Sequence, residues 1–109
     1  MSRTDQERLE EILLAIETID RHLQRGPLDD LLVFDAICMR ISQIGETVRT
    51  LGPETKSRAP EIPWQDVAGM RNHLAHRYFE TSRPIVAKAI EFNLPRLGVA
   101  VRALLDGSG

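Results

Sequence analysis

The sequence predicts an all-α protein in which one domain, residues 1–109, folds as an antiparallel four-helix bundle. Apolar residues recur every three or four positions along four segments, which is the spacing of one face of a helix. Glycine and proline residues interrupt the chain between these segments, and no stretch alternates convincingly between apolar and polar residues as a strand would. A length of 109 residues with 42% hydrophobic content supports one modest core.

The first helix is expected over residues 5–24. Thr4 is expected to cap its start, with Glu7 three residues later as the capping-box partner, and Gly26-Pro27 should end it. Its apolar stripe consists of Leu9, Ile12, Leu13, Ile16, Ile19 and Leu23.

The second helix is expected over residues 29–51, and Gly52-Pro53 should end it. Its stripe consists of Phe34, Ile37, Ile41, Ile44, Val48 and Leu51, and it is widened by Leu31, Leu32 and Cys38. A stripe this wide can serve both an internal core and a partner surface.

Residues 52–63 contain three prolines and are expected to form an irregular connector. Pro63 suits the first turn of a third helix, which should run from about residue 63 to about residue 76. The apolar stripe of that helix consists of Val67, Met70 and Leu74.

Residues 79–83 are expected to form a short loop before the fourth helix. Ser82 could cap that helix, with Pro84 at its start. Pro95 should kink the helix and not end it, because the apolar periodicity resumes on the same stripe beyond it.

Composition excludes several classes of protein. With 14 Lys and Arg against 16 Asp and Glu, the chain is too acidic for a non-specific nucleic-acid coat protein. Cys38 is the only cysteine, so an internal disulfide and a cysteine-based zinc site are excluded, and a buried free thiol suits a reducing compartment. The polar N-terminus is not a signal peptide and no apolar run reaches membrane-spanning length, so we expect a cytoplasmic protein.

A polar cluster at the end of the third helix is the candidate site. Six residues fall within eight positions: Arg71, Asn72, His73, His76, Arg77 and Tyr78. A histidine titrates near neutral pH, so His76 could take a proton from an RNA 2′-hydroxyl or give one to the leaving 5′-oxygen. The guanidinium of Arg71 offers a fork of donors to the phosphate. These residue types suit metal-independent cleavage of RNA.

A single rigid helix would not point the two central side chains the same way. At about 100° per residue, Arg71 and His76 differ by about 140°. We therefore expect either that the helix loosens near His76 or that a second copy of the chain completes the site. Gly69 would let another backbone come close there. Efficient cleavage needs both an acid and a base, so one histidine per chain also favours paired sites across a dimer.

Other interpretations of these residues remain open. His73 and His76 could reach one metal ion, but no nearby carboxylate completes a ligand set, and we expect neither a metal nor a cofactor. Taken singly, Arg71 could be an ordinary surface residue, His76 could interact with the helix dipole, and Tyr78 could belong to the core. His22 has no polar residues grouped around it and is read as a surface residue.

The string Arg71-x4-His76-x-Tyr78 resembles the signature of HEPN-domain proteins, specifically the HepT-like toxin family. Two fixed positions alone are unspecific, but the resemblance extends over about residues 30–105 as an ordered set. The matching segments are Ile44-Gly45-Glu46, Pro60-Glu61-Ile62-Pro63-Trp64, Gly69-Met70-Arg71-Asn72, His76-Arg77-Tyr78-Phe79 and Asn93-Leu94-Pro95.

The resemblance implies a helical bundle that dimerises with two motifs facing each other in a cleft. It implies a metal-independent endoribonuclease that is the toxin of a toxin–antitoxin pair. The antitoxin would be a minimal nucleotidyltransferase, which silences the toxin by transferring AMP to the motif tyrosine, here Tyr78.

Carried over by position, Arg71 and His76 are the catalytic pair, Asn72 is a supporting polar residue and Tyr78 is the modification site. His73 and Arg77 occupy variable motif positions and add positive charge for RNA, and Glu46 could face the cleft. The alternatives are a helical module without nuclease activity, which docks or is modified by a nucleotidyltransferase, and a purely structural dimer.

Overall fold

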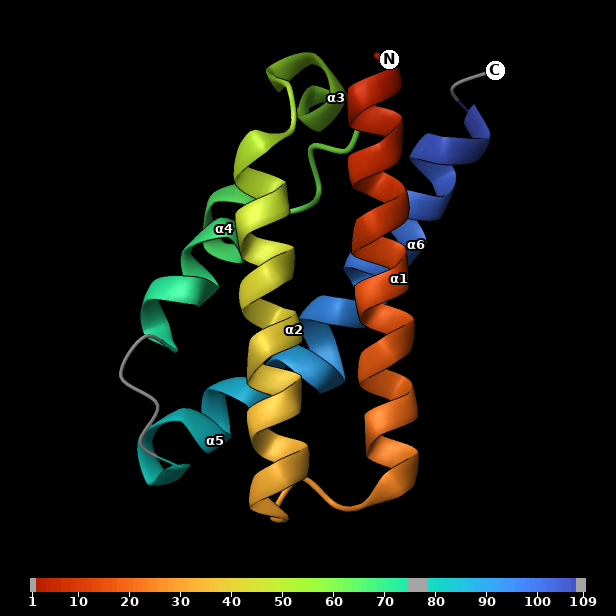
Figure 1. Ribbon diagram of the computed structural model, residues 1–109. Helices are drawn as coiled ribbons and strands as arrows, with labels where there is room; N and C mark the ends of the chain where they lie inside the picture. Colours follow the sequence, from red (N-terminus) through yellow and green to blue (C-terminus); the bar gives the residue numbers. More distant parts are fainter. Residues whose placement is uncertain (1, 75–78, 108–109) are drawn as a thin grey trace.

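The computed structural model describes residues 2–74 and 79–107, and every regular element within them is helical (Figure 1), which confirms the all-α fold class. In chain order the elements are α1 (Arg3–Arg25), α2 (Leu31–Thr50), α3 (Pro53–Ser57), α4 (Trp64–His73), α5 (Phe79–Lys88), the π-helical turn η1 (Ala89–Asn93) and α6 (Leu94–Gly107).

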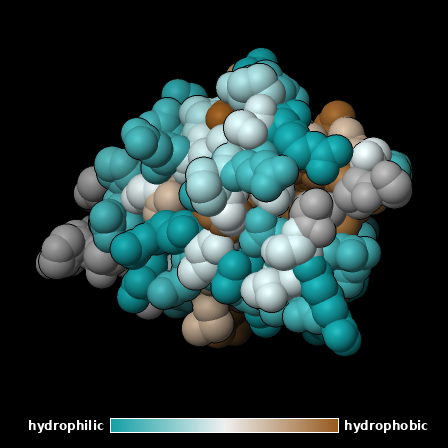
Figure 2. Space-filling view, turned by 90° about the horizontal axis from the view of Figure 1, so that it is seen from above, coloured by the Kyte–Doolittle hydropathy of each residue, from teal (hydrophilic) through white to brown (hydrophobic). Residues whose placement is uncertain are grey.

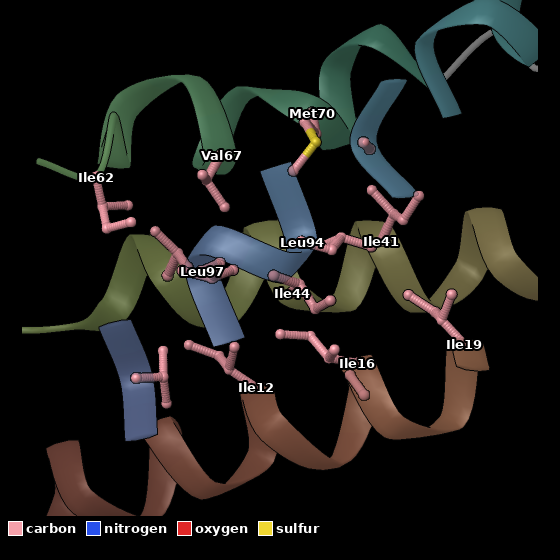
Figure 3. Close-up of a cluster of buried hydrophobic side chains, with 14 of the residues drawn as sticks. Ile12, Ile16, Ile19, Ile41, Ile44, Ile62, Val67, Met70, Leu94 and Leu97 are labelled. Atoms are coloured by element: carbon pink, nitrogen blue, oxygen red, sulfur yellow. The ribbon is translucent and has the colours of Figure 1, made fainter. Parts of the chain in front are cut away.

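Helix α2 lies at the centre of the bundle. It runs antiparallel to α1, and it packs against α1 on one side and α4 on another, while α6 crosses α1 (Figure 1). The predicted apolar stripes meet between these helices. Figure 3 shows Ile12 and Ile16 of α1, Ile44 of α2, Val67 of α4 and Leu97 of α6 pointing into the same space, and all five are at least 93% buried.

One end of the molecule is mainly polar. The end of the molecule that carries the N-terminus and α3 is largely hydrophilic, with hydrophobic side chains confined to small patches (Figure 2). None of the helices in residues 2–74 and 79–107 combines the length and the apolar character that crossing a membrane requires.

The start of α1 differs from the predicted capping box. Ser2, not Thr4, accepts the capping hydrogen bond, from the backbone N–H of Asp5 at 3.0 Å. Asp5 is turned inward, where its carboxylate accepts hydrogen bonds from the Thr55 hydroxyl at 2.6 Å and the Gly52 N–H at 3.1 Å. Burial alone would raise the pKa of Asp5, but these bonds and the charge of Arg8 together lower the pKa below its usual value.

The connector expected to be irregular contains the short helix α3. Pro53 occupies its first turn, where a missing N–H costs little. The indole N–H of Trp64 donates to the carbonyls of Lys56 and Ala59 at 3.0 and 3.1 Å, and so fastens the connector to α4. Pro63 precedes α4 as its cap residue and is not its first helical residue.

The predicted loop at residues 79–83 is wrong, because these residues already belong to α5. Pro84 lies inside that helix, and Ser82 is buried within it, so Ser82 does not cap its start. A tertiary contact explains the difference: the ring of Phe79 packs edge-on against Phe34 of α2 with centroids 5.0 Å apart. This packing favours a helix in a segment whose sequence suggests a break.

A π-helical turn precedes Pro95. The N–H of Leu94 bonds to the carbonyl of Ala89, five residues back, and α6 continues through Pro95 without interruption. Proline cannot donate a backbone hydrogen bond and its ring crowds the preceding turn, so a wider turn relieves the clash. The kink itself stays a prediction.

Candidate functional site

Helix α4 presents the first half of the polar cluster. It ends at His73, three residues earlier than predicted, where the N–H of Leu74 bonds to the carbonyls of Met70 and Arg71 at 3.1 and 3.2 Å. His76, Arg77 and Tyr78 lie outside the described residues. The predicted angle of about 140° between Arg71 and His76 assumed one continuous helix to residue 76, and it stays untested.

Three candidate site residues lie on the outer side of α4. Met70 and Leu74 are 8% and 1% exposed and fix the inner face of the helix, while Arg71, Asn72 and His73 are exposed. Within the described part of the chain, the side chains of Asn72 and His73 make no hydrogen bond or ion pair with other residues. The site is therefore open to solvent at the end of α4.

An ion pair holds Arg71 in place. Its Nη1 lies 2.8 Å from Oε2 of Glu46, which projects from the neighbouring helix α2. Both side chains are about half exposed, at 49% and 59%, and pairs of this kind stabilise a fold by about 0–1 kcal/mol. The pair therefore matters more for the position of the guanidinium than for stability. Its remaining N–H groups stay available to an anion such as phosphate.

Close packing of α2 on α4 brings this pair together. A Cβ atom added at Gly45 would lie 3.1 Å from the carbonyl oxygen of Val67 and 3.2 Å from that of Ala68. A side chain here would push the two helices apart by a few tenths of an ångström, so glycine favours this approach, and the next residue, Glu46, stands beside Arg71.

Among residues 2–74 and 79–107, no backbone approaches Gly69 closely. A Cβ atom at Gly69 would have no neighbour within 4 Å, and an approach by a second copy there stays a prediction. The sequence does contain a signal for Gly45, which is a glycine inside an apolar helical stripe. Such glycines usually have a packing reason, because glycine costs about 1 kcal/mol in a helix relative to alanine.

No metal centre is formed by the residues that the structure describes, where no three His, Cys, Asp or Glu side chains gather closely enough to hold an ion. His76 lies outside these residues.

The family model described as "Ribonuclease HepT-like" matches residues 9–104. A protein of Thermococcus cleftensis named "Probable ribonuclease HepT" is 31% identical over 101 residues, which cover 89% of this chain and 92% of that protein. A relative from Caldanaerobacter subterraneus subsp. tengcongensis, which also carries an RNase name, is 30% identical over 109 residues, covering 95% and 96% of the two chains. No solved structure gives a significant match.

Proposed function

The chain belongs to the HepT-like ribonuclease family, and from this premise we propose that it is a metal-independent endoribonuclease. The observation that carries the proposal is the Arg71–Glu46 pair, which holds a guanidinium at the open end of α4, five residues before His76. An exposed, oriented guanidinium is the group that a phosphodiester needs for binding and for stabilising its transition state.

The proposed reaction is transfer of the phosphate to the neighbouring 2′-oxygen. A histidine base, His76, removes the proton from the 2′-hydroxyl, and the 2′-oxygen attacks phosphorus. The bond to the 5′-oxygen breaks and that oxygen takes a proton from an acid, leaving a 2′,3′-cyclic phosphate and a 5′-hydroxyl. Arg71 binds the non-bridging oxygens, whose charge rises in the transition state, with Asn72, His73 and Arg77 as further contacts to the RNA.

A homodimer would supply the second histidine. The exposed face of α2 supports this arrangement, because Leu32 and Met39 are 82% and 59% exposed, and Glu46 follows at the same seven-residue spacing. Residues seven apart lie on the same side of a helix, so these apolar side chains lie on the same side of α2 as Glu46, the partner of Arg71. A second copy covering them would bring its own motif towards Arg71.

The proposed regulation is covalent. A nucleotidyltransferase antitoxin would transfer AMP from ATP to the hydroxyl of Tyr78, releasing pyrophosphate, and so silence the toxin. The attached phosphate and nucleoside would add bulk and negative charge within seven residues of Arg71. That charge would repel RNA phosphate and engage the arginine.

Cleavage of RNA by the purified protein, with and without EDTA, tests this proposal. We expect cleavage in EDTA, a loss of about 100-fold or more for His76→Ala, and no loss for His22→Ala, a matched control on α1. Normal cleavage by a folded His76→Ala protein would contradict the proposal, as would complete loss in EDTA. AMP on Tyr78 without any cleavage by the unmodified protein would favour the binding-module alternative.

A further inference from the structure

A hollow of about 380 Å³ lies on the side of α4 that faces α5 and η1. Its floor is apolar and is formed by Val67 and Met70, which are buried, and by Ile85 of α5, which is half-buried. Gly69 also lines it, and the space where a Cβ atom would stand is empty to at least 4 Å. A flat group can therefore lie against the backbone of α4 there.

Polar side chains surround this floor. Gln65, Asp66 and His73 of α4, Lys88 of α5 and Asn93 of η1 line the hollow. Among the described residues, the side chains of Asp66, His73 and Lys88 form no hydrogen bond or ion pair with one another or with any other group. One ammonium group, one imidazole, one carboxylate acceptor and two amides thus line the hollow.

The hollow extends along α4 from Gln65 to His73, and its His73 end lies nearest to the candidate catalytic site. His73, on its rim, follows Arg71 by two residues and precedes His76 by three. Residues two positions apart in a helix, such as Arg71 and His73, point about 200° apart. The hollow and the Arg71–Glu46 pair therefore lie on opposite sides of the end of α4. A strand bound at Arg71 would reach the hollow by crossing this end.

We propose that the hollow is a subsite for one base of the RNA substrate, on the opposite side of α4 from the phosphate bound at Arg71, and that it selects a base with an exocyclic amino group. The inference rests on the proposed function. An apolar floor with a few polar groups is typical of sites for small ring systems, and a volume of about 380 Å³ suits one nucleotide. The Asp66 carboxylate can only accept hydrogen bonds, so it favours adenine or cytosine, which carry amino donors, over uracil.

Lys88 and His73 would contact the phosphates on either side of that base. Proteins that bind single-stranded RNA combine cationic groups for the backbone with surfaces for unstacked bases. The arrangement here has both within one hollow, along the helix that carries Arg71.

Binding of uncleavable RNA tests the subsite independently of catalysis. Fluorescent 2′-O-methyl hexamers of adenosine, cytidine or uridine lack the attacking hydroxyl and can be titrated by anisotropy. We expect the wild-type protein to bind the adenosine and cytidine hexamers about tenfold more tightly than the uridine hexamer. Asp66→Asn should reduce this gap to within about threefold.

Substitutions at two positions, Gly69 and Lys88, probe the floor and the rim. Gly69→Leu should weaken binding of all hexamers about tenfold and Gly69→Ala less, although both replace a helical glycine by a better helix former. Lys88→Ala should lower the slope of log affinity against log salt by about 0.7, whereas Arg3→Ala, which removes a fully exposed charge at the far end of α1, should not.

The outcomes separate this inference from the proposed function. Equal binding of the three hexamers, or a preference that survives both Asp66→Asn and Gly69→Leu, overturns the subsite even if the protein cleaves RNA normally. The expected base preference in a protein that does not cleave RNA upholds the subsite and contradicts the proposed nuclease.

Discussion

Two glycine-to-alanine substitutions provide a direct test of how α2 and α4 pack. Both Gly45 and Gly69 lie inside helices, so replacing either one by alanine gains about 1 kcal/mol of helix propensity. Their surroundings differ, because the new methyl group would lie 3.1 Å from a carbonyl oxygen at Gly45 and in open space at Gly69.

The difference in stability between the two variants isolates the packing cost. At Gly45 the neighbours are backbone oxygens of α4, which cannot turn away as a side chain can, so the helices must separate by a few tenths of an ångström. Overpacking of this kind typically costs about 1–3 kcal/mol. Since the propensity gain is common to both variants, we expect Gly45→Ala to be about 2 kcal/mol less stable than Gly69→Ala.

Thermal and urea unfolding followed by circular dichroism would measure this difference. For a chain of this size, about 2 kcal/mol corresponds to a gap of about 8 °C between the two melting temperatures. Because the protein is expected to dimerise, the variants must be compared at equal concentration. Equal stability of the two variants would refute the close approach at Gly45, and with it the reason given for the position of Arg71.

Three other substitutions give separable results. Glu46→Gln should lower RNA cleavage about tenfold while changing the free energy of unfolding by less than about 1 kcal/mol. The exposed control Glu54→Gln on α3 should change neither quantity. Unaltered cleavage by Glu46→Gln would contradict the positioning role of Glu46. The pKa of Asp5 is lowered in the fold, so its contribution is present above the unfolded pKa near 3.8 and is lost as pH falls through the lower folded value. Asp5→Asn should therefore reduce the free energy of unfolding at pH 7 and flatten its dependence on pH below about 5, as measured by urea unfolding at several pH values. An unchanged dependence of stability on pH in this acid range would count against the role of the carboxylate. Met39→Glu should give a folded monomer without cleavage activity, and a stable, active dimer by sedimentation would exclude this face of α2 as the interface.

Much of the fold can be predicted from apolar periodicity. The stripes expected on the first and second helices form the core because burial at three- and four-residue spacing is a local property of the sequence. The errors occur where distant contacts decide. Phe79, in the segment predicted as a loop, packs against Phe34, 45 positions earlier. At the start of α1, Ser2 replaces Thr4 as the cap, and the carboxylate of the capped residue Asp5 bonds to Gly52, 47 positions later.

The candidate site is predictable in its residue types but not in its partners. Arg71 and its neighbours stand out as a polar cluster, and the structure places Arg71, Asn72 and His73 on the exposed side of α4. The contact with Glu46 joins residues 25 positions apart, and it depends on how closely two helices pack. Periodicity along one helix carries no information about that distance.

The π-helical turn sets the rotational register of the last helix. Such a turn holds one residue more than the α-helical turn it replaces, so the side chains beyond it are rotated by about 100°. Leu97 and Val101 of α6 are each 1% exposed or less because that rotation points them at the core. Deleting one residue within 89–93 would restore an α-helical turn. It would rotate α6 as a unit and move its apolar face towards water.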